Sequence, residues 1–264
     1  MTGEVLPNLT TMLFVPANKR RMVEKAQTLD ASAVILDLED GVGIGEKDEA
    51  RATAAEILAE AWPVTPLLFV RVNGPSSPHF EADLEAVAPV APFGVCIPKC
   101  ESASDVEAAA AALARHRAPD SVRLLPFVES ACGVIRAFEI ASASDRVVAM
   151  ALGSEDLAAD MGLRRTKSAT ELIYFRSAIS TAAHAAGVVP IDTVFIDFGD
   201  PEGLFSDATV GRGLGFGGKQ IIHPSQIEPV ARAYEPTADE IARAERILEA
   251  FDDAESRPAP ALLR

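Results

Sequence analysis

Ionisable and polar side chains occur at the carboxyl-terminal ends of short apolar runs along this 264-residue sequence. From the second run onward they are, in chain order, Asp37, Glu39 and Asp40; Arg71 and Asn73; Lys99; Glu129; Glu155 and Asp156; Asp197 and Asp200; and His223. If the runs are parallel strands of one closed sheet, their carboxyl ends meet at a single opening. The sequence therefore predicts a polar mouth, suited to acid–base or metal-assisted chemistry.

Carboxylates outnumber cations at this predicted mouth. Arg71 and Lys99 are too few to compensate the negative charges, which would repel one another unless a further cation is bound. The oxygen ligands on offer, with no cluster of His and Cys, favour Mg²⁺ over Zn²⁺, with Mn²⁺ as an alternative. Because Mg²⁺ usually takes one or two protein carboxylates, Glu129 and Asp156 from neighbouring runs are the predicted metal ligands.

Structural roles compete with these interpretations. Glu129 or Asp156, taken singly, could cap a helix or form a salt bridge at the start of a loop. Arg71 could serve only to neutralise a carboxylate of the barrel. Asp40 stands before a glycine, which is typical of a turn. His223, a single histidine at the end of a run, is typical of a structural hydrogen bond.

The elements that must position these residues form a regular series. Eight apolar runs rich in β-branched residues lie at 11–17, 33–40, 67–74, 94–100, 122–130, 147–156, 190–200 and 218–224. Most are continuously apolar, as expected of strands covered on both faces of a parallel sheet. Stretches with helical spacing separate them, among them 19–29, 46–61, 102–115 and 168–186. Eight such units predict a (β/α)8 TIM barrel, an α/β fold.

The chain is predicted to be a single domain over residues 1–264. The barrel would occupy about 11–236, since 264 residues match the roughly 250 that this fold needs. The segment TADE at 237–240 is a capping-box pattern, which predicts a short helical extension over about 237–254. Residues 255–264, ESRPAPALLR, are predicted to be a frayed tail.

Composition and charge exclude several classes of protein. The 24 Lys and Arg against 39 Asp and Glu give a net charge of −15, which disfavours binding to nucleic acid or to anionic membrane lipid. There is no apolar run of membrane-spanning length and no signal-peptide pattern, so a cytoplasmic location is expected. The three cysteines, Cys96, Cys100 and Cys132, form no CxxC and predict neither a disulfide scaffold nor a zinc site.

Nine segments carry a family resemblance. They are LFVPANKRRMVEKA (13–26), ILDLEDGV (35–42), EKDEAR (46–51), VRVNG (70–74), IPKCES (97–102), PFVESACGV (126–134), LGSEDLAADMG (152–162), IDTVFIDFGDPEGL (191–204) and GFGGKQIIHPSQI (215–227). Together they resemble the citrate lyase β-subunit-like family of the HpcH/HpaI aldolase superfamily over about residues 11–236. The resemblance implies a TIM barrel that usually assembles as a homotrimer or hexamer.

The resemblance also implies roles for individual residues. The positions of Glu129 and Asp156 bind Mg²⁺ in that family, and the arginine at the position of Arg71 binds the carboxylate of a 2-oxo acid. Asp37 and Glu39 line the same mouth as catalytic groups. Basic residues after the first run, here Lys19 and Arg20 with Lys25 further along, lie where family members receive the phosphates of coenzyme A.

The implied reaction is reversible carbon–carbon cleavage. A 3-hydroxy-acyl thioester of citryl-, malyl- or citramalyl-CoA type would give an acyl thioester and a 2-oxo acid. Family members generally continue into a segment with a GxMID-like motif whose aspartate is the proposed acid/base, and the 255–264 segment contains no such motif. Asp37, Asp200 or a partner subunit could supply the group. The alternatives are a non-catalytic subunit that binds metal, 2-oxo acid or acyl-CoA, and an aldolase acting on free 2-oxo acids.

Overall fold

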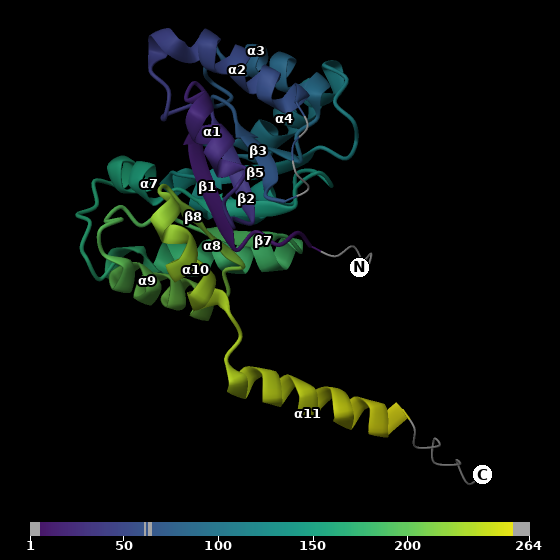
Figure 1. The fold of residues 1–264 in the computed structure, drawn as a ribbon, viewed down its shortest axis with the longest axis vertical. Helices are drawn as coiled ribbons and strands as arrows, with labels where there is room; N and C mark the ends of the chain where they lie inside the picture. Colours follow the sequence, from purple (N-terminus) through teal and green to yellow (C-terminus); the bar gives the residue numbers. More distant parts are fainter. Residues whose placement is uncertain (1–5, 61, 63–64, 256–264) are drawn as a thin grey trace.

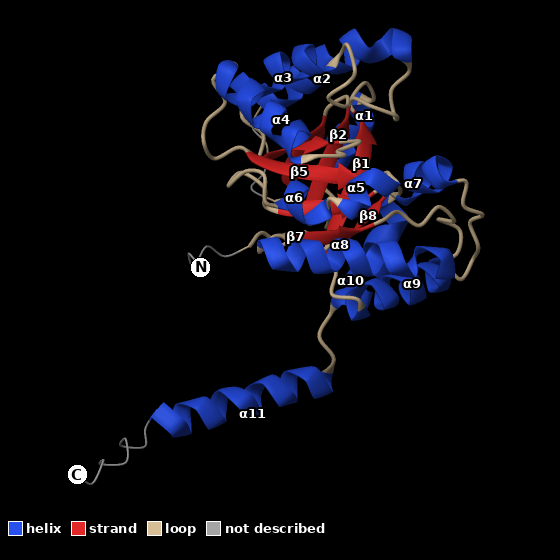
Figure 2. Ribbon diagram, turned by 180° about the vertical axis from the view of Figure 1, so that it is seen from behind, coloured by secondary structure: helices blue, strands red, loops and turns tan. Residues whose placement is uncertain are grey.

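The computed structural model of the protein describes residues 6–60, 62 and 65–255, and within them eight parallel strands close into one barrel. The strands follow one another around the barrel in chain order, and β8 pairs with β1 to complete it. Their bounds are β1 Thr11–Pro16, β2 Ala33–Asp37, β3 Leu67–Arg71, β4 Gly94–Ile97, β5 Arg123–Val128, β6 Ala149–Leu152, β7 Val189–Asp192 and β8 Gly218–Ile221. The predicted TIM barrel is confirmed (Figures 1 and 2).

Helices connect the strands and cover the outside of the barrel. Their bounds are α1 Arg20–Ala26, α2 Lys47–Ala59, α3 Phe80–Val87, α4 Ala103–Arg115, α5 Ala131–Ile135, α6 Ala137–Ala141, α7 Ser154–Met161, α8 Ile173–Ala186, α9 Pro201–Gly213, α10 Ile227–Tyr234 and α11 Ala238–Glu255. Short 3₁₀ helices occupy Ile44–Glu46, Ala88–Val90, Thr170–Leu172 and Pro224–Gln226. The predicted C-terminal helix is present as α11, which extends away from the barrel (Figure 1). Of the tail predicted at 255–264, residues 256–264 lie outside the described residues.

Every strand ends earlier than its predicted run, and two end at least four residues early. The run at 190–200 is a strand only as β7, and residues 193–200 form the loop that leads to α9. The run at 147–156 contains β6, but Glu155 and Asp156 lie in the first turn of α7 rather than at a strand end. The 190–200 run is too long because apolar residues continue beyond the last ladder pair, whereas the apolar part of the 147–156 run stops at Leu152 and the rest is the polar start of a helix.

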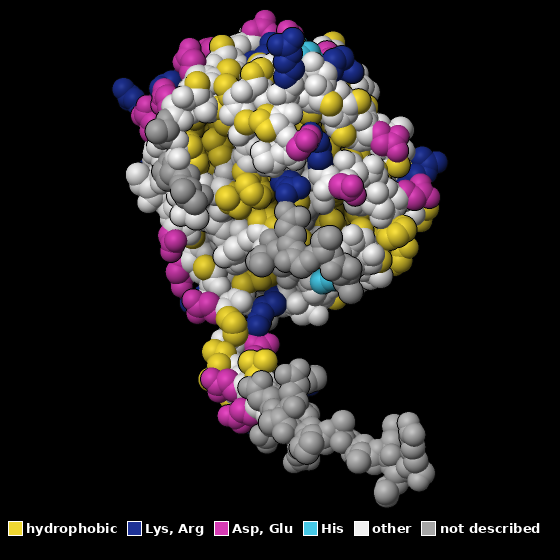
Figure 3. All heavy atoms as spheres, turned by 90° about the vertical axis from the view of Figure 1, so that its right-hand side faces the viewer, with side chains coloured by type: hydrophobic (Ala, Val, Ile, Leu, Met, Phe, Trp, Pro, Cys, Tyr) yellow, Lys and Arg dark blue, Asp and Glu magenta, His cyan; other side chains and the backbone are white. Residues whose placement is uncertain are grey.

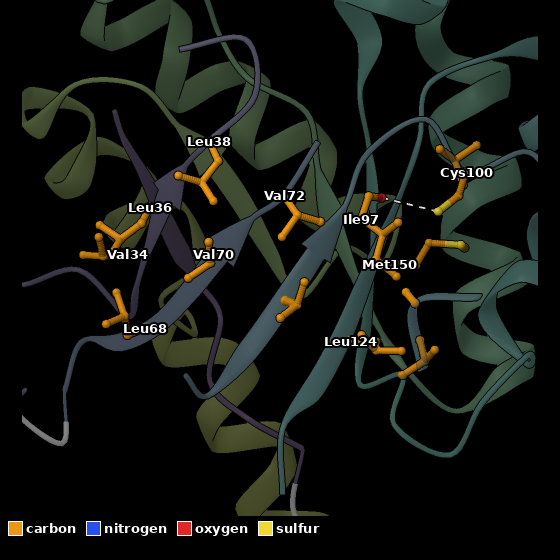
Figure 4. Close-up of a cluster of buried hydrophobic side chains, with 14 of the residues drawn as sticks. Val34, Leu36, Leu38, Leu68, Val70, Val72, Ile97, Cys100, Leu124 and Met150 are labelled. Atoms are coloured by element: carbon orange, nitrogen blue, oxygen red, sulfur yellow. Dashed lines mark hydrogen bonds between the residues drawn. The ribbon is translucent and has the colours of Figure 1, made fainter. Parts of the chain in front are cut away.

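Apolar side chains alternate between two layers along each strand. The inward set fills the barrel and includes Met12, Ile35, Phe69, Cys96, Leu125 and Phe127. The outward set packs against the helices and includes Val34, Leu36, Leu68 and Val70 (Figure 4). The inside of the barrel is therefore a packed core, as in other barrels of this kind.

The surface carries charges of both signs. Acidic and basic side chains are interspersed with apolar ones over the face shown in Figure 3. Within residues 6–60, 62 and 65–255, no helix combines the length and the apolar character needed to cross a membrane.

Candidate active site at the carboxyl-terminal mouth of the barrel

The two-residue period of the strands selects the side chains of the mouth. Asp37 is two residues beyond the inward Ile35, Arg71 is two beyond Phe69, and Glu129 is two beyond Phe127. Since alternate residues of a strand point to the same face, these groups form the polar top layer of the barrel interior. They line a cavity of about 320 Å³, together with Asp156, Thr193 and Gln220.

Asp37 and Arg71 form a bidentate pair on adjacent strands. Nε of Arg71 donates to Oδ1 of Asp37 at 2.8 Å and Nη2 donates to Oδ2 at 2.7 Å. The Asp37 carboxylate also accepts hydrogen bonds from the backbone N–H groups of Glu39 and Gly41, at 2.9 and 2.8 Å. Burial alone would raise the pKa of Asp37, but the hydrogen bonds and charge of Arg71 outweigh it and hold that pKa below its usual value.

Glu39 lies between the two cations of the mouth. Its Oε1 accepts a hydrogen bond from Nζ of Lys99 at 2.7 Å, and its Oε2 is 3.2 Å from Nη1 of Arg71. Burial raises the pKa of Glu39 even though both cations act against it. Arg71 therefore pairs with two carboxylates of the barrel, Asp37 and Glu39, as the structural alternative for this residue expected of one. Because two of its five N–H donors bond to Asp37, donors remain for a ligand in the cavity.

Glu129 is a buried carboxylate for which the described residues supply no ion pair. It is only 4% exposed, and Oε2 accepts the backbone N–H of Lys99 at 2.9 Å. Lys99 makes this bond with a backbone φ of +55°, a left-handed conformation that is uncommon for a residue other than glycine. Burial first, and then the charges of Glu39 and Asp156, raise the pKa of Glu129 to about 8. The ionised form of Glu129 is thus under-stabilised by the protein's own groups.

Asp156 faces the same space as Glu129 from the first turn of α7. Both residues line the 320 Å³ cavity and also a second cavity of about 400 Å³ on the side of Lys99. The approach is permitted by Gly153, where a Cβ would lie 2.4 Å from Cγ of Glu129. The helix start is fixed to β7, because Oγ1 of Thr193 accepts the backbone N–H of Ser154 at 3.1 Å and donates to its Oγ at 2.6 Å.

This arrangement fits a hard divalent cation. The described part of the chain contains no group of three or more His, Cys, Asp or Glu placed as metal ligands. Mg²⁺ does not need one, since it commonly uses one or two carboxylates and completes its shell with water or substrate oxygens. Glu129 has the required character, because it is buried, near other carboxylates, and bonded to a backbone N–H instead of a cation.

The basic residues predicted to receive coenzyme A lie apart from this cavity. Arg20, in α1, forms ion pairs with Glu24, Glu56 and Glu60, so its charge is already engaged. Lys19 precedes α1 and is exposed. The structure does not bring Lys19 or Arg20 together with the residues that line the mouth cavity.

Other predicted residues have structural contacts. Oδ1 of Asp200 caps α9 by accepting the N–H of Gly203, and the side chain lines a separate cavity of about 470 Å³ with Asp197. His223 caps a 3₁₀ helix and stacks on Phe198 with ring centroids 5.1 Å apart. Glu155 pairs with Arg165. Asp40 is half-exposed and 3.7 Å from Nζ of Lys99.

The sequence interpretation missed several residues of the mouth. Thr193 and Gln220 occupy inward positions just above β7 and within β8, and Nε2 of Gln220 donates to the carbonyls of Leu152 and Asp192. Extending the two-residue period beyond the inward Ile191 would have identified Thr193, whereas β8 has no inward apolar residue from which to reach Gln220. Lys47, at the start of α2, is buried behind Glu39, although its position in a helical pattern gave no such signal.

Three protein relatives and a family model match most of the chain. The HpcH/HpaI aldolase/citrate lyase model matches residues 10–224. The citrate lyase subunit beta of Leuconostoc mesenteroides subsp. cremoris is 36% identical over 252 residues, covering 94% of this chain and 83% of the relative. A (3S)-malyl-CoA thioesterase of Cereibacter sphaeroides is 38% identical, covering 93% and 84%. The mitochondrial citramalyl-CoA lyase of Rattus norvegicus is 32% identical, covering 92% and 76%.

Several solved structures are similar in fold to this chain. Protein CitE from Mycobacterium tuberculosis, in complex with magnesium, acetoacetate and coenzyme A, superposes with a TM-score of 0.78 at 35% identity, covering 96% of this chain and 90% of that one. The same protein with magnesium and pyruvate gives 0.77 at 35% identity, covering 92% and 100%. RipC from Yersinia pestis gives 0.75 at 29% identity, covering 90% and 100%.

Proposed function

The chain belongs to the HpcH/HpaI aldolase/citrate lyase family, and from this premise we propose that it is a Mg²⁺-dependent carbon–carbon lyase. Its substrate would be a 3-hydroxy-acyl thioester of citryl-, malyl- or citramalyl-CoA type, cleaved to or formed from an acyl thioester and a 2-oxo acid. The observation that carries the proposal is the presence of an anchored guanidinium, Arg71, in one cavity with the under-compensated carboxylate of Glu129 and the carboxylate of Asp156.

Glu129 and Asp156 would hold the metal ion. When bound, Mg²⁺ polarises the substrate oxygens and stabilises the negative charge that develops on them. The proposal of Mg²⁺, with Mn²⁺ as the alternative, is supported by the magnesium complexes of the related CitE protein. The coenzyme A complex of that protein supports a CoA thioester as the substrate.

Arg71 would bind the carboxylate of the 2-oxo acid. The fork of N–H donors in a guanidinium matches a planar carboxylate and fixes its orientation. Asp37 and Glu39 hold Arg71 in place, with contacts to Nε, Nη2 and Nη1. Asp37 has both oxygens engaged and a lowered pKa, so we assign it to holding Arg71 and not to accepting the hydroxyl proton.

A second reaction is favoured by one relative. The (3S)-malyl-CoA thioesterase is 38% identical to this chain, so hydrolysis of the thioester bond is the alternative chemistry in the same site. The two reactions differ in their products. Carbon–carbon cleavage leaves the thioester bond intact and releases a 2-oxo acid, whereas hydrolysis releases free thiol and no 2-oxo acid.

One assay separates the candidates. The purified protein is incubated with Mg²⁺ and malyl-, methylmalyl- or citramalyl-CoA, while 2-oxo acid and free thiol are measured in parallel. The lyase proposal expects 2-oxo acid without thiol. Thiol alone would indicate the thioesterase, and metal-dependent binding without turnover would indicate a non-catalytic subunit. Aldol activity on free pyruvate without any reaction of the thioesters would indicate the free-acid aldolase.

A further inference from the structure

Lys47 is a buried cation that lies directly behind the mouth. It is the first residue of α2 and is 7% exposed. Its Nζ donates to the carbonyl oxygens of Leu38 and Glu39 at 2.7 and 2.6 Å. The carbonyl of Leu38 receives a further hydrogen bond from Nδ2 of Asn73 at 3.0 Å. A helix start outside the barrel is thereby tied to the turn that follows β2.

The ammonium has no carboxylate partner of its own. Among the described residues, no Asp or Glu oxygen forms an ion pair with Nζ of Lys47, in contrast to Lys219, which is also buried and is paired with Asp192 and Asp207. Burying an unpaired charge is costly unless hydrogen bonds compensate for it. The two carbonyls of the turn are those compensating partners, so any movement of the turn would leave the cation unsatisfied.

These bonds fix the backbone of Glu39 on both sides. Its N–H donates to Oδ1 of Asp37 at 2.9 Å and its C=O accepts from Lys47. With the backbone held in this way, the Glu39 carboxylate lies against Nη1 of Arg71 and Nζ of Lys99. The contact chain therefore runs from Lys47 through Glu39 to the guanidinium that faces the cavity.

We propose that Lys47 is a positioning residue for the 2-oxo acid subsite, acting through the Leu38–Glu39 turn to fix the guanidinium of Arg71. The inference rests on the proposed function, since it assumes that Arg71 receives a 2-oxo acid. It does not extend to the metal ligands. Glu129 follows β5 and Asp156 lies in α7, and neither has a hydrogen bond or an ion pair with Lys47, Leu38 or Glu39 among the described residues.

The test uses isothermal calorimetry on the full chain. One titration is with Mg²⁺, and a second is with pyruvate at saturating Mg²⁺. Lys47→Met, which keeps the apolar stem and removes the ammonium, is expected to weaken pyruvate binding about 10-fold or more, as truncation of a buried charged hydrogen-bond partner does. Mg²⁺ affinity should stay within about threefold of the parent's, which corresponds to a change of less than about 1 kcal/mol in binding free energy. Lys47→Arg retains a cation, but its larger planar head cannot reproduce both short bonds to the turn, so it should weaken pyruvate binding to a smaller degree than Lys47→Met.

Arg146→Met is the matched control. Arg146 also donates to two backbone carbonyls, those of Pro119 and Val122 at 2.9 Å each, but it does so before β5, at the opposite end of the barrel from the mouth. Its removal should leave both affinities unchanged. If Lys47→Met bound pyruvate as tightly as the parent, or if it lost Mg²⁺ and pyruvate affinity to the same degree, the positioning role would be wrong.

Binding of Mg²⁺ and pyruvate to the parent protein distinguishes failure of the proposed function from failure of the role of Lys47. If the parent protein binds neither Mg²⁺ nor pyruvate, the proposed function fails and Lys47 is not at issue. If the parent binds both, only the variants decide. Should Lys47→Met fail to fold, as judged by circular dichroism, Lys47→Arg carries the test alone: the positioning role requires weakened pyruvate binding with unchanged Mg²⁺ affinity, and parental affinity for pyruvate would overturn it.

Discussion

Arg71 and Asp37 face each other in register across β2 and β3, and two parallel hydrogen bonds join the guanidinium to the carboxylate. The pair is buried, yet the arginine still borders the mouth cavity. Asp37 therefore orients Arg71 through Nε and Nη2 and leaves the remaining donors of the guanidinium free of bonds to Asp37. A ligand carboxylate would bind the donors of Arg71 that Asp37 does not use, while Asp37 holds the guanidinium in place.

Replacing Arg71 by lysine should weaken binding of 2-oxo acids even though the charge is retained. An ammonium cannot form the two parallel bonds to Asp37 and simultaneously present a fork to a ligand. We expect pyruvate or oxaloacetate affinity to fall about 10-fold or more, equivalent to at least about 1.4 kcal/mol. Calorimetry at saturating Mg²⁺ measures the change, and undiminished affinity would place the oxo-acid subsite elsewhere.

Removing charge from the proposed metal ligands should act on Mg²⁺. Glu129→Gln and Asp156→Asn keep side-chain volume and should each lower Mg²⁺ affinity at least about 10-fold, in line with the strong dependence of metal sites on ligand charge. Because burial and neighbouring carboxylates disfavour the ionised form of Glu129, Glu129→Gln should not lower the melting temperature of the metal-free protein. A Mg²⁺ titration of each variant checks the first expectation, and parental affinity in both would contradict the assignment.

Gly153 should be essential to the geometry of the same site. A Cβ there would lie 2.4 Å from both Cγ and Oε1 of Glu129, so Gly153→Ala must displace that side chain. We expect a loss of about 1–3 kcal/mol in unfolding free energy together with weaker Mg²⁺ binding. Gly213→Ala is the control, because no atom lies within 4 Å of the added Cβ. Similar unfolding curves for the two variants would show that Glu129 can move aside without cost.

The charge cluster between β7, β8, α8 and α9 should make stability depend on pH. Burial would raise the pKa of Asp207, but the charges of Lys219 and Arg176 outweigh it and lower that pKa below 3.8. A group whose pKa is lowered by folding stabilises the protein above its unfolded value, and that contribution is lost as the pH falls through the folded value. Asp207→Asn should therefore cost about 3 kcal/mol at neutral pH.

The difference between Asp207→Asn and the parent should shrink below about pH 3.8, because the parent then loses the same charge. Asp120→Asn removes an exposed carboxylate paired with Arg146 and should change stability little at any pH. Denaturant unfolding at several pH values measures both. A constant difference across the acid range would mean that the ionisation of Asp207 is not the stabilising factor.

The general architecture followed from local sequence features. Eight continuous apolar runs separated by helical spacing are sufficient to indicate a closed parallel barrel, because few other folds bury so many short strands on both faces. The strand ends were less predictable. Ladder pairing stops at Asp192, although apolar residues continue through Val194 and Phe195, and only the three-dimensional arrangement of neighbouring strands determines that limit.

The candidate site was predictable where a residue is the last of a strand or follows the strand directly. Asp37, Arg71 and Glu129 belong to this group, since their distance from the inward apolar residues fixes their direction. Partners contributed from outside the strands were not predictable. Lys47 contacts the turn behind the mouth from α2, and Arg20 pairs with Glu56 of α2 and with Glu60 just after it, so both depend on how α1 and α2 pack around the barrel.

Because side chains alternate along each strand, packing against the helices and forming the reactive layer depend on different residues. Helix packing depends on Val34, Leu36, Val70 and their outward neighbours, while the reactive layer depends on residues pointing the other way from the same strands. Reactive groups can consequently be exchanged as a set during evolution without disturbing the supporting shell. A deletion of one residue inside β5 would disturb both sets of residues. It would exchange the inward and outward faces of the strand and turn Glu129 out of the mouth.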